Sequence, residues 1–466
     1  MCFITRLITS VNYAEDIDSL RFALATQFDY NILNQRPHFP GYPIFCYMAK
    51  IIYFFIGSIQ YTYSIIGSIS MIILIFFSKK IASILYFDKN YFLTFIFFIN
   101  PFFWILSNRY MSDLFGLSFL IMACYYFLKS FEQKDIKYSY FASFILGTLV
   151  GIRASFLPFF LPFIIYFIIS NTRHLLLYIS FFSMGILLWL IPLVCITDPI
   201  QLYNLALTDV NGHFNNWGGT ILSSDNSIIN RFYKTFESIW ADGLGGWWIG
   251  RNFLTLITSI GISIFIFNGL KVSKNKIKKK HSIILTCILV YFIWILFFQN
   301  VVYKPRHVIP LIPFLLMLID IGFQKSIKNN FVKILFVIFC ISIISITGML
   351  NYQHKYKKTA INQMKETVIN YEYTQKVFYS SKLIRDYINS HMNKYGYLEK
   401  YSNSEKNYFK VKTLYNKNFV ILSTIKLDSN FFNLVDKKIF FHNPYMNRLW
   451  PTIHLYIYSK SVPLTK

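Results

Sequence analysis

Long apolar runs separated by short polar gaps occupy most of the chain between residues 43 and 350. An α-helix needs roughly 20 apolar residues to cross a bilayer. The pattern predicts ten membrane-spanning helices, at 60–78, 91–107, 113–129, 138–152, 154–170, 175–196, 253–269, 283–300, 308–323 and 332–350. A further apolar helix at 43–58 follows a Pro-Gly-Tyr-Pro turn and is interrupted by Lys50, so it is expected to lie at the membrane interface.

Composition agrees with an all-α polytopic membrane protein. The chain is 55% hydrophobic and only 14% charged, against about 25% charged residues in soluble domains. Its net charge of +25 comes from lysines in short gaps and in the tail, which argues against a nucleic-acid partner. The six cysteines are scattered, without the spacing of a disulfide framework or a zinc site.

The distribution of lysines orients the predicted helices. The positive-inside rule assigns lysine-rich gaps to the cytoplasm, here 79–80, 129–137, 171–174, 271–281 and 324–333. The remaining segments then face outward: loops 13–42 and 197–252, gaps 108–113, 151–155 and 303–307, and the tail after 350. We therefore expect a multi-pass protein of the plasma or inner membrane whose C-terminal region is extracytoplasmic.

The two ends of the chain differ from this helical region. The tail, residues 351–466, predicts a small α/β domain with strands near 375–381, 418–424, 437–443 and 453–459 and a helix at 382–392. At the other end, an outward-facing start needs a preceding helix. Residues 1–12 reach roughly 18 Å as a helix, short of the roughly 30 Å hydrocarbon core, so a first helix is expected to be missing.

Acidic and basic residues recur at the outward edges of the predicted helices. Asp16 and Asp18 open the helix that contains "LRFALA", where Asp16 also suits a helix cap. The other outward edges carry Asp113, Arg153, Lys304 and Arg306. Charged groups at the rim of membrane spans are costly and often mark functional cavities. Carboxylates that face cations in this way favour a site for an anionic substrate with a general base.

The first outer loop adds a rigid turn to this set. His38 lies between Pro37 and Pro40 in "RPHFPGYP", which restricts its position, and Gly41 is expected to shape the turn. Tyr42 follows as an aromatic that suits a lid or the membrane interface.

Six motifs, in chain order, resemble the GT-C superfamily of membrane glycosyltransferases. The likeness is to bacterial members related to the protein O-mannosyltransferase and lipid A aminoarabinose transferase families. The motifs are "EDIDSLRFALA", "FDYNILNQRPHFPGYPIF", "NRYMSD", "GIRAS", "NWGGTI" and "KPRHVIPLIP", which together span residues 15–313.

The resemblance implies a GT-C-like fold and a sugar transferase whose donor is a polyprenyl-phosphate-linked sugar. It implies Asp18 as the general base, with Asp16 in reserve, and Asp113 as a second outer carboxylate. Arg306 would contact the lipid phosphate. The residues expected to contact substrate are Arg36, His38, Tyr42, Arg153, Lys304, Arg306 and His307. Members of this superfamily differ in their use of metal, so a divalent cation stays open and no metal ligand is assigned.

Two other functions fit part of this pattern. A polysaccharide polymerase or ligase would also pair a large outer loop with arginines. A lipid or solute transporter would place ionisable residues near the bilayer centre and show repeated halves, whereas the charges here concentrate at one face. A transferase acting on an extracytoplasmic glycan, lipid or protein hydroxyl is therefore the leading hypothesis.

Overall fold

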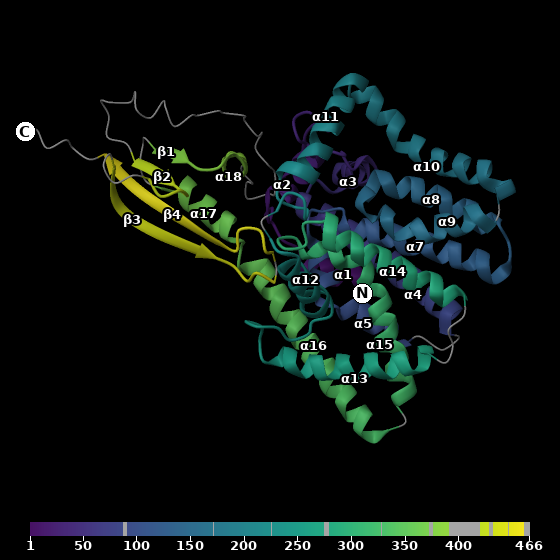
Figure 1. Cartoon of the computed structure of the whole chain (residues 1–466). Helices are drawn as coiled ribbons and strands as arrows, with labels where there is room; N and C mark the ends of the chain where they lie inside the picture. The colour runs from purple at the N-terminus through teal and green to yellow at the C-terminus, as the bar shows by residue number, and fades with distance from the viewer. Residues whose placement is uncertain are drawn as a thin grey trace, which may run out of the picture.

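The computed structural model describes ten segments of the chain, and the structural statements below refer to these residues. The segments are 1–86, 91–170, 172–224, 226–274, 279–327, 329–371, 376–390, 420–427, 432–445 and 447–460. They form a bundle of apolar helices with a small sheet at one end, as Figure 1 shows.

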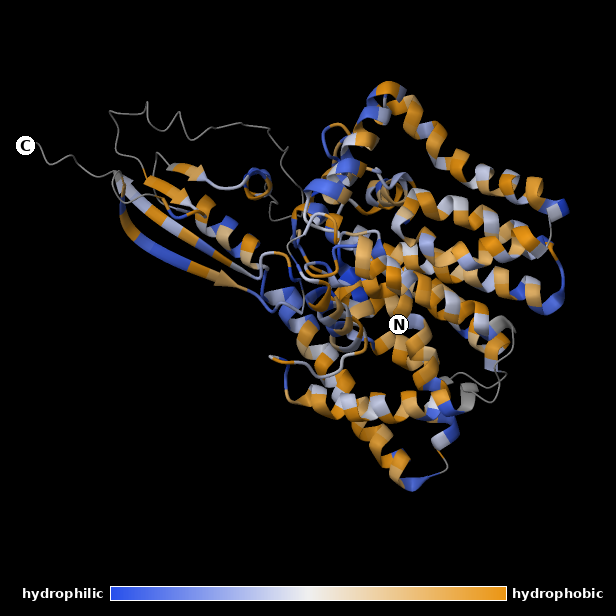
Figure 2. Cartoon of the chain, in the orientation of Figure 1, coloured by the Kyte–Doolittle hydropathy of each residue, from blue (hydrophilic) through white to orange (hydrophobic). Residues whose placement is uncertain are grey.

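Eight helical stretches in the described residues are long and apolar enough to cross a membrane. They are Ile59–Tyr86, Asp113–Gln133, Lys137–Ser170, Thr172–Ile196, Leu254–Lys271, His281–Phe298, Pro305–Ser326 and Asn330–Ile369. Figure 2 shows that hydrophobic residues dominate these helices. The chain is thus a multi-pass membrane protein, as expected. The individual helices are α4 (Ile59–Tyr86), α7 (Asp113–Gln133), α8 (Lys137–Arg153), α9 (Leu161–Ser170), α10 (Leu175–Ile196), α13 (Leu254–Lys274), α14 (Lys279–Phe298), α15 (Ile312–Ser326) and α16 (Asn330–Tyr356).

One of these stretches contains two of the predicted spans. Helix α8 ends at Arg153, and the 3₁₀ helix η1 (Ala154–Phe160) leads into α9. The chain reverses here, because Tyr140 near the start of α8 and Phe167 near the end of α9 both pack against Tyr178. The predicted helices at 138–152 and 154–170 are therefore separate passes, although they follow each other without a non-helical gap.

Two predicted boundaries were wrong. The span expected at 91–107 is broken into α5 (Tyr91–Ile99) and α6 (Pro101–Asn108), of nine and eight residues. Proline lacks the N–H that would continue the helix, and Asn100 caps the second piece by accepting a hydrogen bond from the Phe103 amide. The expected gap at 79–80 is helical, since α4 continues to Tyr86.

Shorter helices occupy the two loops that were expected to face outward. The first loop contains α2 (Ile17–Gln27) and leads into α3 (Pro43–Ile56), which is apolar but too short to span. The second contains α11 (Pro199–Asn211), the π-helix η3 (Gly212–Asn216), α12 (Ile228–Glu237) and the π-helix η4 (Ser238–Gly243). The remaining short elements are α1 (Cys2–Ile8), the 3₁₀ helices η2 (Thr172–His174) and η5 (Pro305–Leu311), α17 (Ala360–Ile369) and α18 (Lys382–Ile388).

The C-terminal region forms a four-stranded sheet, which confirms the predicted α/β composition. Its strands are β1 (Lys376–Tyr379), β2 (Val420–Ser423), β3 (Phe432–Phe441) and β4 (Thr452–Lys460), in the order β1-β2-β4-β3. Strands β1 and β2 pair in parallel, and β4 pairs antiparallel with β2 and β3. The predicted helix is α18, and its expected last residues lie outside the described part of the chain.

The sheet region is packed onto the N-terminal segment rather than standing apart. Tyr387 of α18 donates a hydrogen bond to the Ala14 carbonyl, and Tyr13 donates one to the His354 carbonyl. One hydrophobic core joins residues of α2 and α3 with residues of α17, α18 and the sheet. The domain boundary at 350 stays a prediction, and α16 continues past it to Tyr356.

Candidate active site

Asp18 lies where three segments distant in the sequence meet. It is the second residue of α2, and its Oδ2 accepts hydrogen bonds from Lys304 Nζ at 2.7 Å and from Arg306 Nη2 at 2.8 Å. Both cations belong to the stretch that enters η5, almost 290 residues further along the chain. Arg21, one turn along α2, lies 4.0 Å from the other carboxylate oxygen.

Arg306 is surrounded by three carboxylates. Besides its bond to Asp18, its Nη1 lies 3.7 Å from Asp16 Oδ2, and its Nε lies 3.7 Å from Asp113 Oδ1. Asp113 begins α7 and pairs at 2.8 Å with Arg153, which ends α8. A planar guanidinium suits several carboxylates at fixed angles. The four outward gaps that carry these residues therefore converge on one cluster.

Asp16 has a second role at the start of α2. Its side chain accepts a hydrogen bond from the Ser19 amide at 2.8 Å, and the Ser19 hydroxyl in turn accepts one from the Asp16 amide at 2.9 Å. This capping box satisfies amide groups that the first helical turn leaves without partners. It fixes the start of α2 and so the position of Asp18, two residues later.

The rigid turn predicted in the first loop forms one wall of the cluster. His38 Nδ1 lies 4.0 Å from Asp18 Oδ1, and its Nε2 lies 3.2 Å from the Tyr42 hydroxyl. The buried ring of Phe22 packs edge-on against both His38 and Tyr42. Gly41 has a φ of +88°, a conformation that favours glycine, and an added Cβ would lie 2.4 Å from the Tyr30 hydroxyl oxygen.

Exposure identifies the open side of the cluster. The side chains of Lys304 and His38 are each 26% exposed, whereas Asp113 is fully buried. Asp16, Asp18, Arg153 and Arg306 are buried as well. A ligand that enters from the surface would therefore first meet Lys304 and His38, the two partly exposed neighbours of Asp18.

The cluster favours an additional anion. Three carboxylates, Asp16, Asp18 and Asp113, face four cations, Arg21, Arg153, Lys304 and Arg306. Burial alone would raise the pKa of Asp18, but the attraction of Lys304 and Arg306 holds it well below its usual value. Burial lowers the pKa of His38 to about 3, since the attraction of Asp18 is offset by Arg21, Lys304 and Arg306. At neutral pH Asp18 is thus ionised and His38 is neutral.

A second ionic network stabilises the segment that precedes Asp16. Glu15 accepts hydrogen bonds of 2.5 Å from Arg109 Nε and from His354 Nε2, which lie 94 and 339 residues away. Burial alone would raise the pKa of Glu15, but Arg109 and His354 lower it to about 2. Glu15 therefore connects the start of α2 to the segments before α7 and at the end of α16.

We expect Glu15→Gln to destabilise the protein. The change leaves Arg109 buried without its counter-charge, and breaking a buried ion pair costs about 3–5 kcal/mol. The stabilisation from Glu15 is fully present above pH 4.5, its ordinary pKa, and is lost as the pH falls toward 2. Thermal unfolding of the detergent-solubilised chain at neutral pH measures the loss.

A half-exposed ion pair provides the matched control for this change. Glu366 pairs with Lys358 and is 50% exposed, so Glu366→Gln should cost less than about 1 kcal/mol. Equal thermal stabilities of the two variants at neutral pH would contradict the anchoring role of Glu15.

The loop between β3 and β4 reaches the cluster from the C-terminal region. Asn447 Nδ2 donates to Asp16 Oδ2 at 3.4 Å. Its neighbour Arg448 pairs with Asp242 at 2.5 Å and with Glu237 at 2.9 Å, both at the end of the second outer loop. No sequence pattern indicated the contact between Asn447 and Asp16, because these residues lie more than 400 positions apart in the sequence.

The structure places the other predicted site residues as follows. His307 lies near Lys304, Arg153 and Arg306. Its Nδ1, like Nδ1 of His38, is buried and has no hydrogen-bond partner among the described residues. Arg36 is not brought into the cluster and instead pairs with Asp29 at 2.6 Å. Within the described part of the chain, no group of three or more His, Cys, Asp or Glu side chains is placed to hold a metal ion.

Comparison with solved structures identifies the fold. The chain superposes on ArnT from Cupriavidus metallidurans bound to undecaprenyl phosphate with a TM-score of 0.57, covering 100% of this chain and 97% of that chain at 9% identity. ArnT is an aminoarabinose transferase of the GT-C superfamily. This chain has the GT-C fold. The match to ArnT in the apo state has a TM-score of 0.54 at 8% identity and covers 97% of this chain and 96% of that chain.

The GT-C fold confirms the structural part of the resemblance drawn from the motifs. No protein-family model matches the chain, and no curated protein matches its sequence significantly. At 8–9% identity the superposition establishes the fold alone.

Proposed function

We propose that this protein is an integral-membrane glycosyltransferase. It would move a sugar from a polyprenyl-phosphate donor to a hydroxyl of an extracytoplasmic acceptor. The observation that carries the proposal is the position of Asp18, an ionised carboxylate held by Lys304 and Arg306 directly behind the partly exposed side chains of Lys304 and His38. A GT-C fold similar to that of ArnT bound to undecaprenyl phosphate supports it.

The reaction needs a general base and cations beside the departing phosphate, and the cluster can supply both. The acceptor oxygen forms a bond to the anomeric carbon of the sugar, and the bond from that carbon to the phosphate oxygen breaks. The acceptor proton passes to a base, for which Asp18 is the candidate and Asp16 the reserve. Lys304 and Arg306 stabilise the negative charge that builds on the departing polyprenyl phosphate. Asp113, which pairs with Arg153, faces Arg306 and would hold it in place.

Donor binding would also prepare Asp18 to act as a base. A general base works best when its pKa lies near the working pH, and in the empty site Lys304 and Arg306 hold the pKa of Asp18 well below its usual value. A donor phosphate shares these cations, which weakens their attraction for Asp18 and raises its pKa. The base thus becomes effective when the donor is in place.

Two histidines offer further contacts to the substrates. Nδ1 of His38 and Nδ1 of His307 are buried and have no hydrogen-bond partner in the part of the chain that the structure describes, and such atoms in a native structure call for an explanation. In this proposal, hydroxyls or phosphate oxygens of the bound substrates complete their hydrogen bonding. Tyr42, which contacts His38, would close the same wall.

The test is release of the lipid product. The purified chain in lipid nanodiscs is given lipid-linked sugars extracted from the cells that produce it, together with their envelope glycans. Mass spectrometry should detect free polyprenyl phosphate and a glycan heavier by one sugar. If labelled lipid crosses the bilayer of vesicles that contain the chain and no sugar is transferred, the proposal is wrong and a transporter is favoured.

A further inference from the structure

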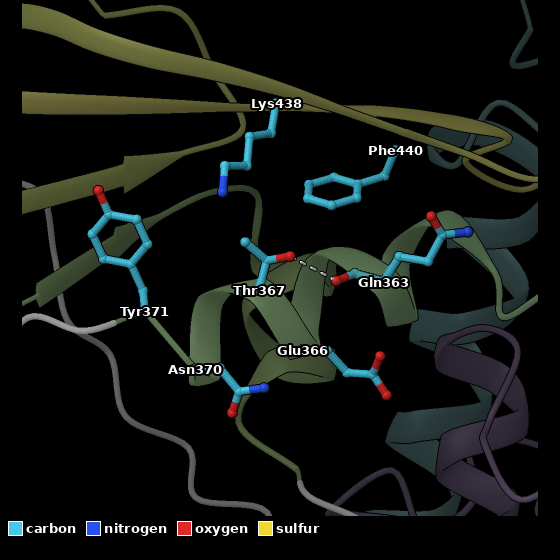
Figure 3. Close-up of a pocket in the computed structure, with 7 residues that line it drawn as sticks. All are labelled: Gln363, Glu366, Thr367, Asn370, Tyr371, Lys438 and Phe440. Atoms are coloured by element: carbon cyan, nitrogen blue, oxygen red, sulfur yellow. Dashed lines mark hydrogen bonds between the residues drawn. The ribbon is translucent and has the colours of Figure 1, made fainter.

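A groove separate from the charged cluster lies between helix α17 and strand β3. Its volume is about 720 Å³, and it is lined by Gln363, Glu366, Thr367, Asn370, Tyr371, Lys438 and Phe440, as Figure 3 shows. Ligand pockets in proteins are typically about 300–1,000 Å³, so the groove is large enough to hold several groups of a ligand. None of these residues was selected from the sequence.

The repeats of a strand and of a helix determine which side chains line the two walls of the groove. Successive strand residues point to opposite faces, so Lys438 and Phe440 both extend over α17 in Figure 3. Gln363, Thr367 and Asn370 share a face of the helix because they are spaced by four and three residues. Strand β3 is at the edge of the sheet, which leaves this wall open to solvent.

The lining combines the chemical groups that bind sugars. The amide of Asn370 can both donate and accept hydrogen bonds, as sugar hydroxyls do. Gln363 already donates from Nε2 to the carbonyls of Lys358 and Phe441, so it offers the acceptor Oε1. Glu366, which also pairs with Lys358, adds an acceptor, and Lys438 adds a donor. The ring of Phe440 offers an apolar face on which the C–H face of a pyranose can pack. Glu366 and Lys438 give the lining one charge of each sign, and a lipid chain would meet mostly polar groups, so a neutral carbohydrate fits best.

Both walls lead toward the charged cluster. Thr359, which precedes α17, donates a hydrogen bond of 3.1 Å to the carbonyl of Glu15, the neighbour of Asp16. A helix rises 1.5 Å per residue, so Gln363 lies roughly 6 Å and Asn370 roughly 16 Å along the axis from Thr359. On the other wall, β3 runs into the loop whose Asn447 contacts Asp16.

We propose that this groove binds a carbohydrate acceptor at sugar units remote from the hydroxyl that is glycosylated. The inference rests on the proposed transferase function and specifies its acceptor class. Contacts distant from the reacting atoms position an acceptor and add to its affinity. The groove thus selects a glycan chain, while the Asp18 cluster carries out the transfer.

Glycan binding by the full chain in nanodiscs tests this proposal directly. The probes are fluorescent neutral oligosaccharides built of hexose or N-acetylhexosamine units. We expect the unmodified chain to bind some of them, and Phe440→Ala to weaken that binding about tenfold. Because Phe440 also packs on the core, the exposed residue Asn370 provides a second variant, Asn370→Ala, which should weaken binding as well.

The neighbouring strand residue supplies a matched control. Phe441 points away from the groove face and is 73% exposed, so Phe441→Ala should bind the oligosaccharides as the unmodified chain does. The proposal is overturned if the unmodified chain binds none of them, if Phe440→Ala and Asn370→Ala bind normally, or if only peptides give a groove-dependent signal.

One further variant separates this proposal from the proposed function. Asp18→Asn should still bind the oligosaccharides, because Asp18 lies outside the groove. If Asp18→Asn transfers sugar normally, the proposed catalytic role fails even where the groove binds glycans. If Asp18→Asn is inactive while Phe440→Ala and Asn370→Ala bind glycans normally, the groove proposal alone fails.

Discussion

Asp18→Asn should lower the rate of sugar transfer by about 10²–10⁴-fold, the usual contribution of a general base. Asparagine keeps the size of the side chain but cannot accept the acceptor proton. Arg306 retains other carboxylates nearby, because it also faces Asp16 and Asp113. The measurement is the initial rate of polyprenyl phosphate release in nanodiscs, with thermal unfolding as the check on folding.

A carboxylate in the same loop controls for the loss of charge. Asp29 pairs with Arg36 and is 54% exposed, so Asp29→Asn should change the rate by less than about threefold. A folded Asp18→Asn protein with at least half of the original rate would exclude Asp18 as the base. Asp16→Asn would then be the next variant, although its loss also removes the cap of α2.

Arg306→Lys should lower the transfer rate by about 10²–10³-fold, the range for removal of a group that stabilises developing negative charge. Lysine retains the charge, but a single ammonium cannot face Asp16, Asp18 and Asp113 in the way that the guanidinium does. We expect the KM for the lipid donor to rise and kcat to fall, since the phosphate is bound in both the ground state and the transition state. Steady-state kinetics with varied donor concentration measures both.

Arg21→Lys is the matched change on the edge of the same cluster. Arg21 lies 4.0 Å from Asp18 and is not buried among the three carboxylates, so the substitution should alter the rate by less than about threefold. If Arg306→Lys, like Arg21→Lys, alters the rate by less than about threefold, the cluster needs a positive charge at residue 306 but not the geometry of a guanidinium.

The helical part of the fold was largely predictable because membrane spans leave a strong sequence signal. A span must satisfy its backbone within itself and expose apolar side chains, and 175–196 matches α10 at both ends. The errors fall where the chain departs from a regular span. Asn100-Pro101 breaks one apolar run into two helices, and α4 continues through the lysines at 79–80.

The candidate site was predictable as a set of positions but not as a set of contacts. Sidedness placed Asp18, Asp113, Arg153 and Arg306 at one face, and the structure brings them together. Pairing is decided by the tertiary fold. Arg36 stands in the same motif as His38, yet it contacts Asp29 instead.

Contacts over long sequence separations left no signal that a single sequence could reveal. Glu15 stood in the "EDIDSLRFALA" motif and Arg109 in the "NRYMSD" motif, but nothing linked either residue to His354. Asn447 lies in a loop of the C-terminal sheet, and only the packing of that region on α2 brings it to Asp16. The groove between α17 and β3 arises in the same way, from two elements that are separated in the chain by about 60 residues.

In the proposed reaction, the Asp18 cluster transfers a sugar to an envelope glycan. The most direct test compares envelope glycans, by mass spectrometry, from cells that lack the gene and carry either the unmodified chain or Asp18→Asn. We predict that the unmodified chain restores one sugar residue on a glycan and that Asp18→Asn, present in the membrane at an equal level, does not. Identical glycans in the two strains, each bearing that sugar, would contradict it.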